Sequence, residues 1–360
     1  MKTKIKKAIL KITPDFVYEK YRDAKANKHV TIYNQNSKFT KYTSKYKKVS
    51  VIVPNYNYEH YIEERIDSIL FQTYPIYELI ILDDKSTDNS VEKIEQIIKK
   101  HQEIKIKFIK NEKNSGSVFS QWQKAFSLAK GDYVWICEAD DSCNKDFLKN
   151  VMLGFNDKDV VLSYAESMRI DENNRIISPS CRDWMLAVSK TKWNKSYVND
   201  GAEEIKDALA VCNTIPNVSA VVFKKGNQIE VIEQAKKFKI SGDWYVYYQL
   251  LSKGKIAYCH KSLNYFRKHS KSTSTVASRE LEITELLTIQ SDIRKNYELD
   301  SEQIHKQSFR YGAIINETSD IFRNEVSSMI AKKIAWIIPW PIKGSGGIRT
   351  MIQNANFLVR

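Results

Sequence analysis

The sequence predicts an α/β protein whose mostly parallel sheet is flanked by helices and followed by a helical C-terminal region. Apolar runs and amphipathic stretches alternate from residue 49 onward, in repeated strand and helix order. Two of the apolar runs are followed directly by aspartates, in DDKSTD at 83–88 and EADD at 138–141. That position is the carboxyl end of a strand, where open α/β sheets bind ligands.

The composition is that of a globular chain with an uneven charge. Its 360 residues are 42% hydrophobic, which is enough to bury a large core. The net charge is +14, and residues 1–48 hold fourteen Lys and Arg against three acids, a net +11. The basic character therefore belongs to an N-terminal arm, and the remaining 312 residues carry only +3.

The cysteines and the hydropathy favour a reducing compartment. Five cysteines without a CxxC pair are typical neither of a disulfide framework nor of a zinc site. No apolar run approaches the roughly 18–20 residues of a membrane-spanning helix. The apolar stretch at the N-terminus is broken by Lys11 and lacks a signal-peptide cleavage site. We therefore predict a cytoplasmic protein.

Residues 1–48 are predicted to form a basic amphipathic arm and linker. Five apolar residues recur at helical spacing with lysines on the other face, namely Ile5, Ala8, Ile9, Ile12 and Phe16. Such a helix suits an anionic membrane surface, here the inner face of the cell membrane, and it equally suits packing on the protein body. Residues 30–48 are predicted to be a polar linker.

The first half of the sheet is predicted from four apolar runs, at residues 49–53, 79–82, 105–109 and 133–137. Amphipathic helices are expected between them, and Asp88 or Ser90 is a suitable cap for the second helix. Repeated strand, helix, strand order implies parallel strands with helices on both faces.

The second half is less regular. Strands are predicted at 160–164, 219–223 and 255–259, and a helix at 242–252. A long Trp-rich segment, 165–215, separates the first two of these strands, and residues 271–330 are predicted to be a helical region.

Five segments, in this order and spacing, closely resemble the inverting family 2 glycosyltransferases with the GT-A fold. They are VSVIVPNYN (49–57), LIILDDKSTD (79–88), NEKNSG (111–116), GDYVWICEADD (131–141) and ISGDWYVYYQL (240–250). The resemblance covers about residues 49–270, which we take as the GT-A domain. It implies transfer of a sugar from a nucleotide diphosphate sugar, most often a UDP-sugar, to a glycan or lipid-linked acceptor in surface polysaccharide assembly. It also implies a cofactor, Mg²⁺ or Mn²⁺.

The resemblance assigns the nucleotide side of the donor site. Pro54 and Tyr56 would line the base pocket, and Asp84 would accept a hydrogen bond from the base, as an ionised carboxylate can. DDKSTD by itself also suits a turn and helix cap. Asn114 and Gly116 would lie where the N-terminus of a helix faces the donor, although an ordinary loop explains them as well.

The resemblance also assigns the diphosphate and metal side. Asp140 and Asp141 match the metal and donor motif, with Asp141 expected to contact the metal directly. The family often begins this motif with Asp where this chain has Glu138. In NYFRKHS at 264–270, Arg267 would pair with phosphate and His269 would ligate the metal or contact the diphosphate; a structural role for His269 is the alternative.

Asp243, in SGDW, matches the general base of the family. Inversion needs a carboxylate on the acceptor side of the sugar to take the hydroxyl proton. A helix cap is the other interpretation, because Asp243 precedes an apolar helical run. Trp244 is predicted either to stack on the acceptor sugar or to lie in the core.

Residues 331–360 resemble the opening strand, Gly-rich loop and first helix of a family 4 glycosyltransferase with the GT-B fold. One βα unit cannot bury its own faces, so a truncated second domain is one interpretation and a hairpin packed on the main body is the other.

Two other functions fit parts of the pattern. A sugar-phosphate nucleotidyltransferase also carries acids at strand ends, but it usually has a Gly-rich basic signature after the first strand, where this chain reads PNYNYEHY. A nucleic-acid-binding protein would explain the charge, yet no such motif appears in the body, and we predict no nucleic-acid partner.

Overall fold

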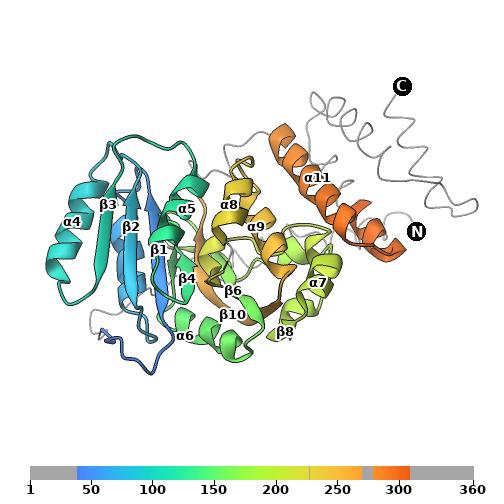
Figure 1. Cartoon of the computed structure of the whole chain (residues 1–360), viewed down its shortest axis with the longest axis horizontal. Coiled ribbons are helices and arrows are strands. Elements are labelled where there is room, and N and C mark those ends of the chain that lie inside the picture. Colours follow the sequence, from blue (N-terminus) through green and yellow to red (C-terminus); the bar gives the residue numbers. More distant parts are fainter. Residues whose placement is uncertain (1–38, 227, 270–278, 309–360) are drawn as a thin grey trace, which may run out of the picture.

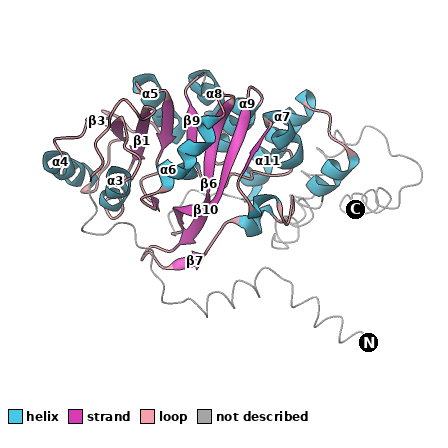
Figure 2. Ribbon diagram, turned by 90° about the horizontal axis from the view of Figure 1, so that it is seen from below, coloured by secondary structure: helices cyan, strands magenta, loops and turns pink. Residues whose placement is uncertain are grey.

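The computed structural model describes residues 39–226, 228–269 and 279–308. The predicted N-terminal amphipathic helix and the βα unit predicted over 331–360 lie outside these residues. A ten-stranded sheet runs through the molecule, with helices on both of its faces (Figures 1 and 2). Its strand order is β3-β2-β1-β4-β9-β6-β10-β5, with β7 beside β6 and β8 beside β10.

The first four strands confirm the predicted parallel order. They are β1 (Val49–Asn55), β2 (Glu78–Asp83), β3 (Ile106–Lys110) and β4 (Tyr133–Ile136). β1 pairs in parallel with β2 and β4, and β2 pairs in parallel with β3. Every residue of β1, β2 and β4 is buried, since both faces are covered.

The second half of the sheet is mixed. β9 (Val221–Lys224) runs antiparallel to both of its neighbours, β4 and β6 (Val160–Ile170). β10 (Lys255–Arg267) returns to the parallel direction beside β6. The short strands β5 (Ser142–Cys143), β7 (Ile176–Ser178) and β8 (Tyr197–Asn199) are all antiparallel to their partners.

Two groups of helices sandwich the sheet. One face packs on α3 (Ile62–Leu70), α4 (Ser90–Lys100) and α6 (Phe147–Met152). The other packs on α5 (Val118–Leu128), α8 (Gln228–Ala235), α9 (Gly242–Leu251) and α11 (Arg279–Asn296). Neighbouring residues of β1 divide between the two cores, as strand geometry requires: Val51 joins the first and Ile52 the second. α11, with helical residues 301–308, confirms the helical region after the sheet.

Two segments differ from their prediction. The Trp-rich segment contains β7, β8, the short helix α7 (Gly201–Glu204) and a π-helical turn, Ile205–Leu209, where we predicted no regular elements. The described end of the predicted linker, residues 39–48, forms no helix or strand but packs on the body through Tyr42 and Tyr46. No helix in the described part of the chain is long and apolar enough to cross a bilayer.

Candidate functional site

The two aspartate turns meet at one edge of the sheet. Asp83 is the last residue of β2 and Asp84 follows it, and Asp140 and Asp141 follow β4. Both strands are parallel neighbours of β1, so their carboxyl ends share an edge. The sheet therefore brings together the two motifs that the sequence singled out.

The carboxylate of Asp84 is 5% exposed and faces the loop before α5. It accepts hydrogen bonds from Asn111 Nδ2 at 2.7 Å, Gln121 Nε2 at 2.8 Å, and the amide and hydroxyl of Ser115. Asp83 has a different task, because it accepts bonds from Asn55 Nδ2 and from the amide and hydroxyl of Ser86. The first acid holds the turn, and the second ties the turn to the loop 111–116.

The remaining residues predicted for the base pocket lie around this turn. Pro54 is buried in β1 opposite Leu82, whereas Tyr56 is 45% exposed at the end of that strand. The side chain of Asn114 accepts the amide of Gly116 at 2.7 Å. Gly116 has φ of +65° with open space where a Cβ would stand, so its backbone conformation is what favours glycine. α5 begins two residues later, with its amino end beside this loop.

Asp141 lies inside the protein. It is 1% exposed and accepts hydrogen bonds from Ser219 Oγ at 2.6 Å, Asn217 Nδ2 at 2.9 Å and the amide of Arg267 at 2.9 Å. Burial, and after it the charge of Asp140, raises the pKa of Asp141. The carboxylate of Asp141 therefore connects the turn after β4 with the residues just before β9 and with the end of β10.

Asp140 faces outward and pairs with His269. Its Oδ2 lies 2.9 Å from His269 Nε2, and the two side chains are 15% and 5% exposed. The ring of His269 packs against Tyr61, with centroids 5.6 Å apart, and against Tyr58 at 6.1 Å. Burial and the charge of Asp140 raise the pKa of Tyr58. Neither tyrosine was predicted as a site residue, and both lie in the stretch PNYNYEHY after the first strand.

The residues at this turn fit a hard divalent cation with few protein ligands. Within the described residues, His, Cys, Asp and Glu side chains form no cluster of three or more with metal-binding geometry. Asp140 and His269 supply a carboxylate oxygen and a ring nitrogen at one point. Mg²⁺ is commonly held by one or two protein carboxylates together with substrate phosphates, and Mn²⁺ accepts imidazole as well.

Arg267 is held by groups of the protein around the acidic turn. Its guanidinium is 1% exposed and donates to the carbonyl oxygens of Asp140 (2.7 Å) and Asp171 (3.0 Å). It also donates to Asn174 Oδ1 and to a carboxylate oxygen of Glu64. These contacts hold the backbone of the acidic turn, and pairing of Arg267 with a phosphate stays a prediction.

Glu138 and Arg65 complete the electrostatics of the turn. Burial, followed by the charges of Asp140 and Asp141, raises the pKa of Glu138 to about 8. Arg65 of α3 is fully buried, and its guanidinium lies 5.4 Å from the ring centroid of Trp135 and beside the thiols of Cys137 and Cys143. Its positive charge partly offsets the raised pKa of Glu138 and Asp141. Nothing in the spacing of the sequence indicated this buried cation.

Asp243 is the second residue of α9, and Ser241 occupies the N-cap position. Its carboxylate accepts the amide of Trp244 at 2.7 Å and lies 3.4 Å from Asn213 Nδ2. Burial raises the pKa of Asp243 to about 7. Trp244 is 2% exposed and donates to the carbonyl of Leu209, so it belongs to the core.

Side chains of α5 connect Asp243 to the acidic turn. A Cβ on Gly242 would lie 2.3 Å from the ring of Phe119, so glycine is needed for the close approach of α9 to α5. The ring of Phe119 packs on Trp122, whose Nε1 donates to Glu138 at 3.3 Å. The charges of Asp243 and Glu138 both act on the buried hydroxyl of Tyr247. Asp243 and the acidic turn therefore belong to one site.

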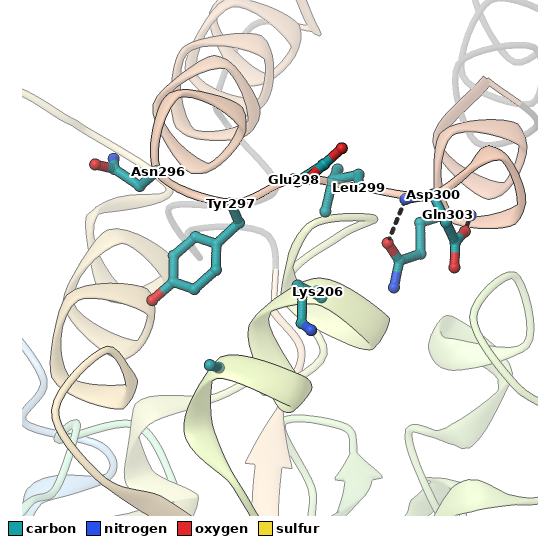
Figure 3. A pocket seen from close by; sticks show the side chains of 8 residues that line it. Lys206, Asn296, Tyr297, Glu298, Leu299, Asp300 and Gln303 are labelled. Carbon is teal, nitrogen blue, oxygen red and sulfur yellow. Dashed lines mark hydrogen bonds between the residues drawn. The ribbon is translucent and has the colours of Figure 1, made fainter.

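A surface pocket of about 520 Å³ lies elsewhere, between α7 and the chain that follows α11 (Figure 3). Its lining includes Tyr297, Lys206, Asp300 and Gln303. Asp300 and Gln303 bond each other's backbone amides at 2.9 and 2.8 Å, which is a capping box for the helix at 301–308. These polar groups stabilise a helix end, and none of the predicted site residues lines this pocket.

The sheet and its flanking helices have the GT-A type of architecture, and the comparisons with solved structures agree on this fold. Staphylococcus aureus TarS 1-349, solved in complex with UDP-GlcNAc, superposes with a TM-score of 0.57 at 19% identity over 80% of each chain. The mannosyltransferase PcManGT of Pyrobaculum calidifontis, solved with GDP-Man and Mn²⁺, gives 0.50 at 16% identity over 95% of this chain and 92% of that one.

Residues 50–212 match the family model described as glycosyl transferase family 2. An uncharacterized glycosyltransferase of Nostoc, alr2836, is 29% identical over 228 residues, which are 62% of this chain and 65% of that one. A poly(ribitol-phosphate) beta-glucosyltransferase of Bacillus spizizenii is 37% identical over 103 residues, 28% of this chain and 16% of that one. The chain thus spans less than two thirds of these relatives. The family 4 resemblance of residues 331–360 stays a prediction.

Proposed function

We propose that this protein is an inverting glycosyltransferase that moves a sugar from a UDP-sugar to a hydroxyl of a glycan or lipid-linked acceptor. The observation that carries the proposal is the meeting of Asp84 and Asp140, which pairs with His269, at the carboxyl edge of the parallel strands. Asp243 lies close enough for its charge and that of Glu138 both to act on the hydroxyl of Tyr247. Because a relative is named for poly(ribitol-phosphate), we propose a surface polymer as the acceptor class. The reaction would take place in the cytoplasm, where nucleotide sugars are made.

Asp140 and His269 are the residues that we propose hold Mg²⁺ or Mn²⁺. Bound there, the cation would neutralise negative charge on the departing nucleoside diphosphate. Asp141, expected from the sequence to be the direct ligand, is proposed instead to fix the turn through Ser219 and Asn217. Arg267 supports the same turn through the carbonyl of Asp140.

Asp243 is proposed as the general base. Asn213 and the amide of Trp244 hold its carboxylate in place, and a pKa of about 7 leaves a large ionised fraction at neutral pH. In the ionised form it takes the proton of the acceptor hydroxyl as the hydroxyl oxygen attacks the sugar. A base whose pKa is near the working pH is ionised in a large fraction of the molecules and still has a high affinity for the proton.

The pH dependence of transfer should report Asp243. Since only the ionised carboxylate can take a proton, we expect the rate to fall as the pH drops below about 7. The folded-state pKa is raised above the value of about 3.9 in an unfolded chain. The contribution of Asp243 to the free energy of unfolding is therefore fully present below about pH 4, and it is lost as the pH rises through about 7 and the buried carboxyl ionises. Transfer rates measured on both sides of pH 7 check the expected fall in rate, and a rate that does not change with pH would contradict it.

Asp84→Ala should weaken nucleotide binding. A lost hydrogen bond to a buried polar group typically costs about 1–3 kcal/mol, or roughly a tenfold to hundredfold rise in Kd. Titration calorimetry with UDP measures the change, and Asp83→Ala is the matched control, since Asp83 holds the same turn without facing the loop 111–116. Equal affinity in folded Asp84→Ala and wild type would leave Asp84 with a structural role only.

A donor screen tests the function as a whole. The protein is incubated with UDP-, dTDP- and GDP-sugars and Mn²⁺ or Mg²⁺, and released nucleoside diphosphate is measured. We expect release from a UDP-sugar. Release of pyrophosphate from a nucleoside triphosphate and a sugar phosphate would instead identify a nucleotidyltransferase.

A further inference from the structure

The amino-terminal edge of the sheet, opposite the acidic turn, carries a cluster of lysines. β1, β2, β3 and β4 run parallel, so their first residues share this edge. Five exposed lysines lie at or next to this edge and are called the lysine patch: Lys45, Lys47, Lys48, Lys105 and Lys130. The segment 39–48, blue along the lower edge of the molecule in Figure 1, supplies the first three.

Tyrosine rings hold these lysines at the surface. The ammonium groups of Lys48 and Lys105 lie 5.4 and 5.0 Å from the ring centroid of Tyr77. Lys47 lies 5.6 Å from the centroid of Tyr133, and its backbone amide donates to the hydroxyl of Tyr74 at 2.7 Å. These cation–π contacts order the lysine stems without removing their charge.

The positive charge of the patch is largely uncompensated. Glu78 is 3% exposed, and one of its carboxylate oxygens accepts hydrogen bonds from Ser50 Oγ and from the amide of Lys130, both at 2.6 Å. Its other oxygen lies 3.5 Å from Lys105. Asp132, just before β4, is an exposed acid beside the patch. Residues 1–38, which precede this segment, add ten Lys and Arg against three acids.

We propose that the lysine patch docks the protein on an anionic lipid surface, with the acidic turn on the side away from the bilayer. Lysines near an anionic leaflet are attracted additively, and tyrosine is enriched at the headgroup level. Every cation of the patch is a lysine, whereas recognition of individual phosphates favours the bidentate fork of arginine. The proposal locates membrane contact on the folded body and does not depend on sugar transfer.

Vesicle binding of the full chain tests the proposal. The probes are vesicles of phosphatidylcholine with phosphatidylglycerol and vesicles of phosphatidylcholine alone, and the readout is the partition coefficient from sedimentation. Wild type should bind the anionic vesicles only. Replacing Lys47, Lys48 and Lys105 together by Ser should lower partitioning on the order of 10²-fold. The control replaces Lys190, Lys195 and Lys237, which are also exposed; Lys237 likewise lies over aromatic rings.

The outcomes separate this surface from its alternatives. Near wild-type partitioning of the patch variant would overturn the proposal and leave the binding to the N-terminal arm. Equal losses of partitioning in the patch and control variants would contradict the proposal, because binding would then depend on the net charge of the protein and not on this surface. If single-stranded oligonucleotide bound wild type more tightly than anionic vesicles and was lost in the same variant, the patch would be a nucleic-acid surface. Release of nucleotide in the donor screen should be unchanged in both variants.

Discussion

Asp243→Asn is expected to lower sugar transfer on the order of 10²–10⁴-fold while leaving donor and metal binding close to wild type. The amide matches the carboxylate in shape and can still accept the amide hydrogen of Trp244. It cannot take a proton from an acceptor hydroxyl, so the loss should fall on kcat. Steady-state transfer and UDP calorimetry on the same preparations measure the two effects.

The same variant tests the competing role of a helix-end residue. Asparagine loses only the interaction of the carboxylate charge with the first turn of the helix, about 0.3–1 kcal/mol, so a purely structural Asp243 would leave turnover unchanged. The variant also removes a buried carboxyl whose pKa is raised to about 7. Above that pH, Asp243→Asn should therefore be at least as stable as wild type. Ser241→Ala, which changes the N-cap of the same helix, is the matched control and should keep its activity.

Asp140→Ala is expected to abolish metal-dependent transfer and leave the fold intact. The Asp140 carboxylate is partly exposed and pairs with the ring of His269, so its removal costs the fold this one contact. Changes in the outer shell of a metal site typically cost about 10–100-fold in affinity, and loss of a direct ligand should cost at least as much. Mn²⁺ titration and transfer assays measure the loss, and excess EDTA should reproduce it in wild type.

Asp141→Ala should behave differently. It leaves Ser219, Asn217 and the amide of Arg267 without their acceptor, at about 1–3 kcal/mol for each donor left unsatisfied. We therefore expect a large drop in the free energy of unfolding as well as lost activity. Should Asp141→Ala prove stable but unable to bind Mn²⁺, while Asp140→Ala binds normally, the assignment of the two acids would have to be exchanged.

Strand positions and the first-half topology were predictable from the sequence. The runs that became β1, β2 and β4 are apolar throughout, because both of their faces are covered by helices, and alternation with amphipathic helices implies parallel pairing. The antiparallel direction of β9 was not predictable. A short apolar run such as Val221–Lys224 has the same pattern in either direction, and its neighbours come from β4 and β6.

The sequence by itself determined which residues gather at the edge of the sheet, since strand ends of a parallel sheet share an edge and four of the five segments that resemble family 2 fall on those ends. Only the tertiary structure decided what each residue does there. Asp140 and Asp141 are adjacent in the chain, yet one faces His269 and the other is enclosed by Ser219 and Asn217. Successive residues of a turn point in different directions, and burial depends on elements more than 70 residues away. A sequence motif carries neither of these facts.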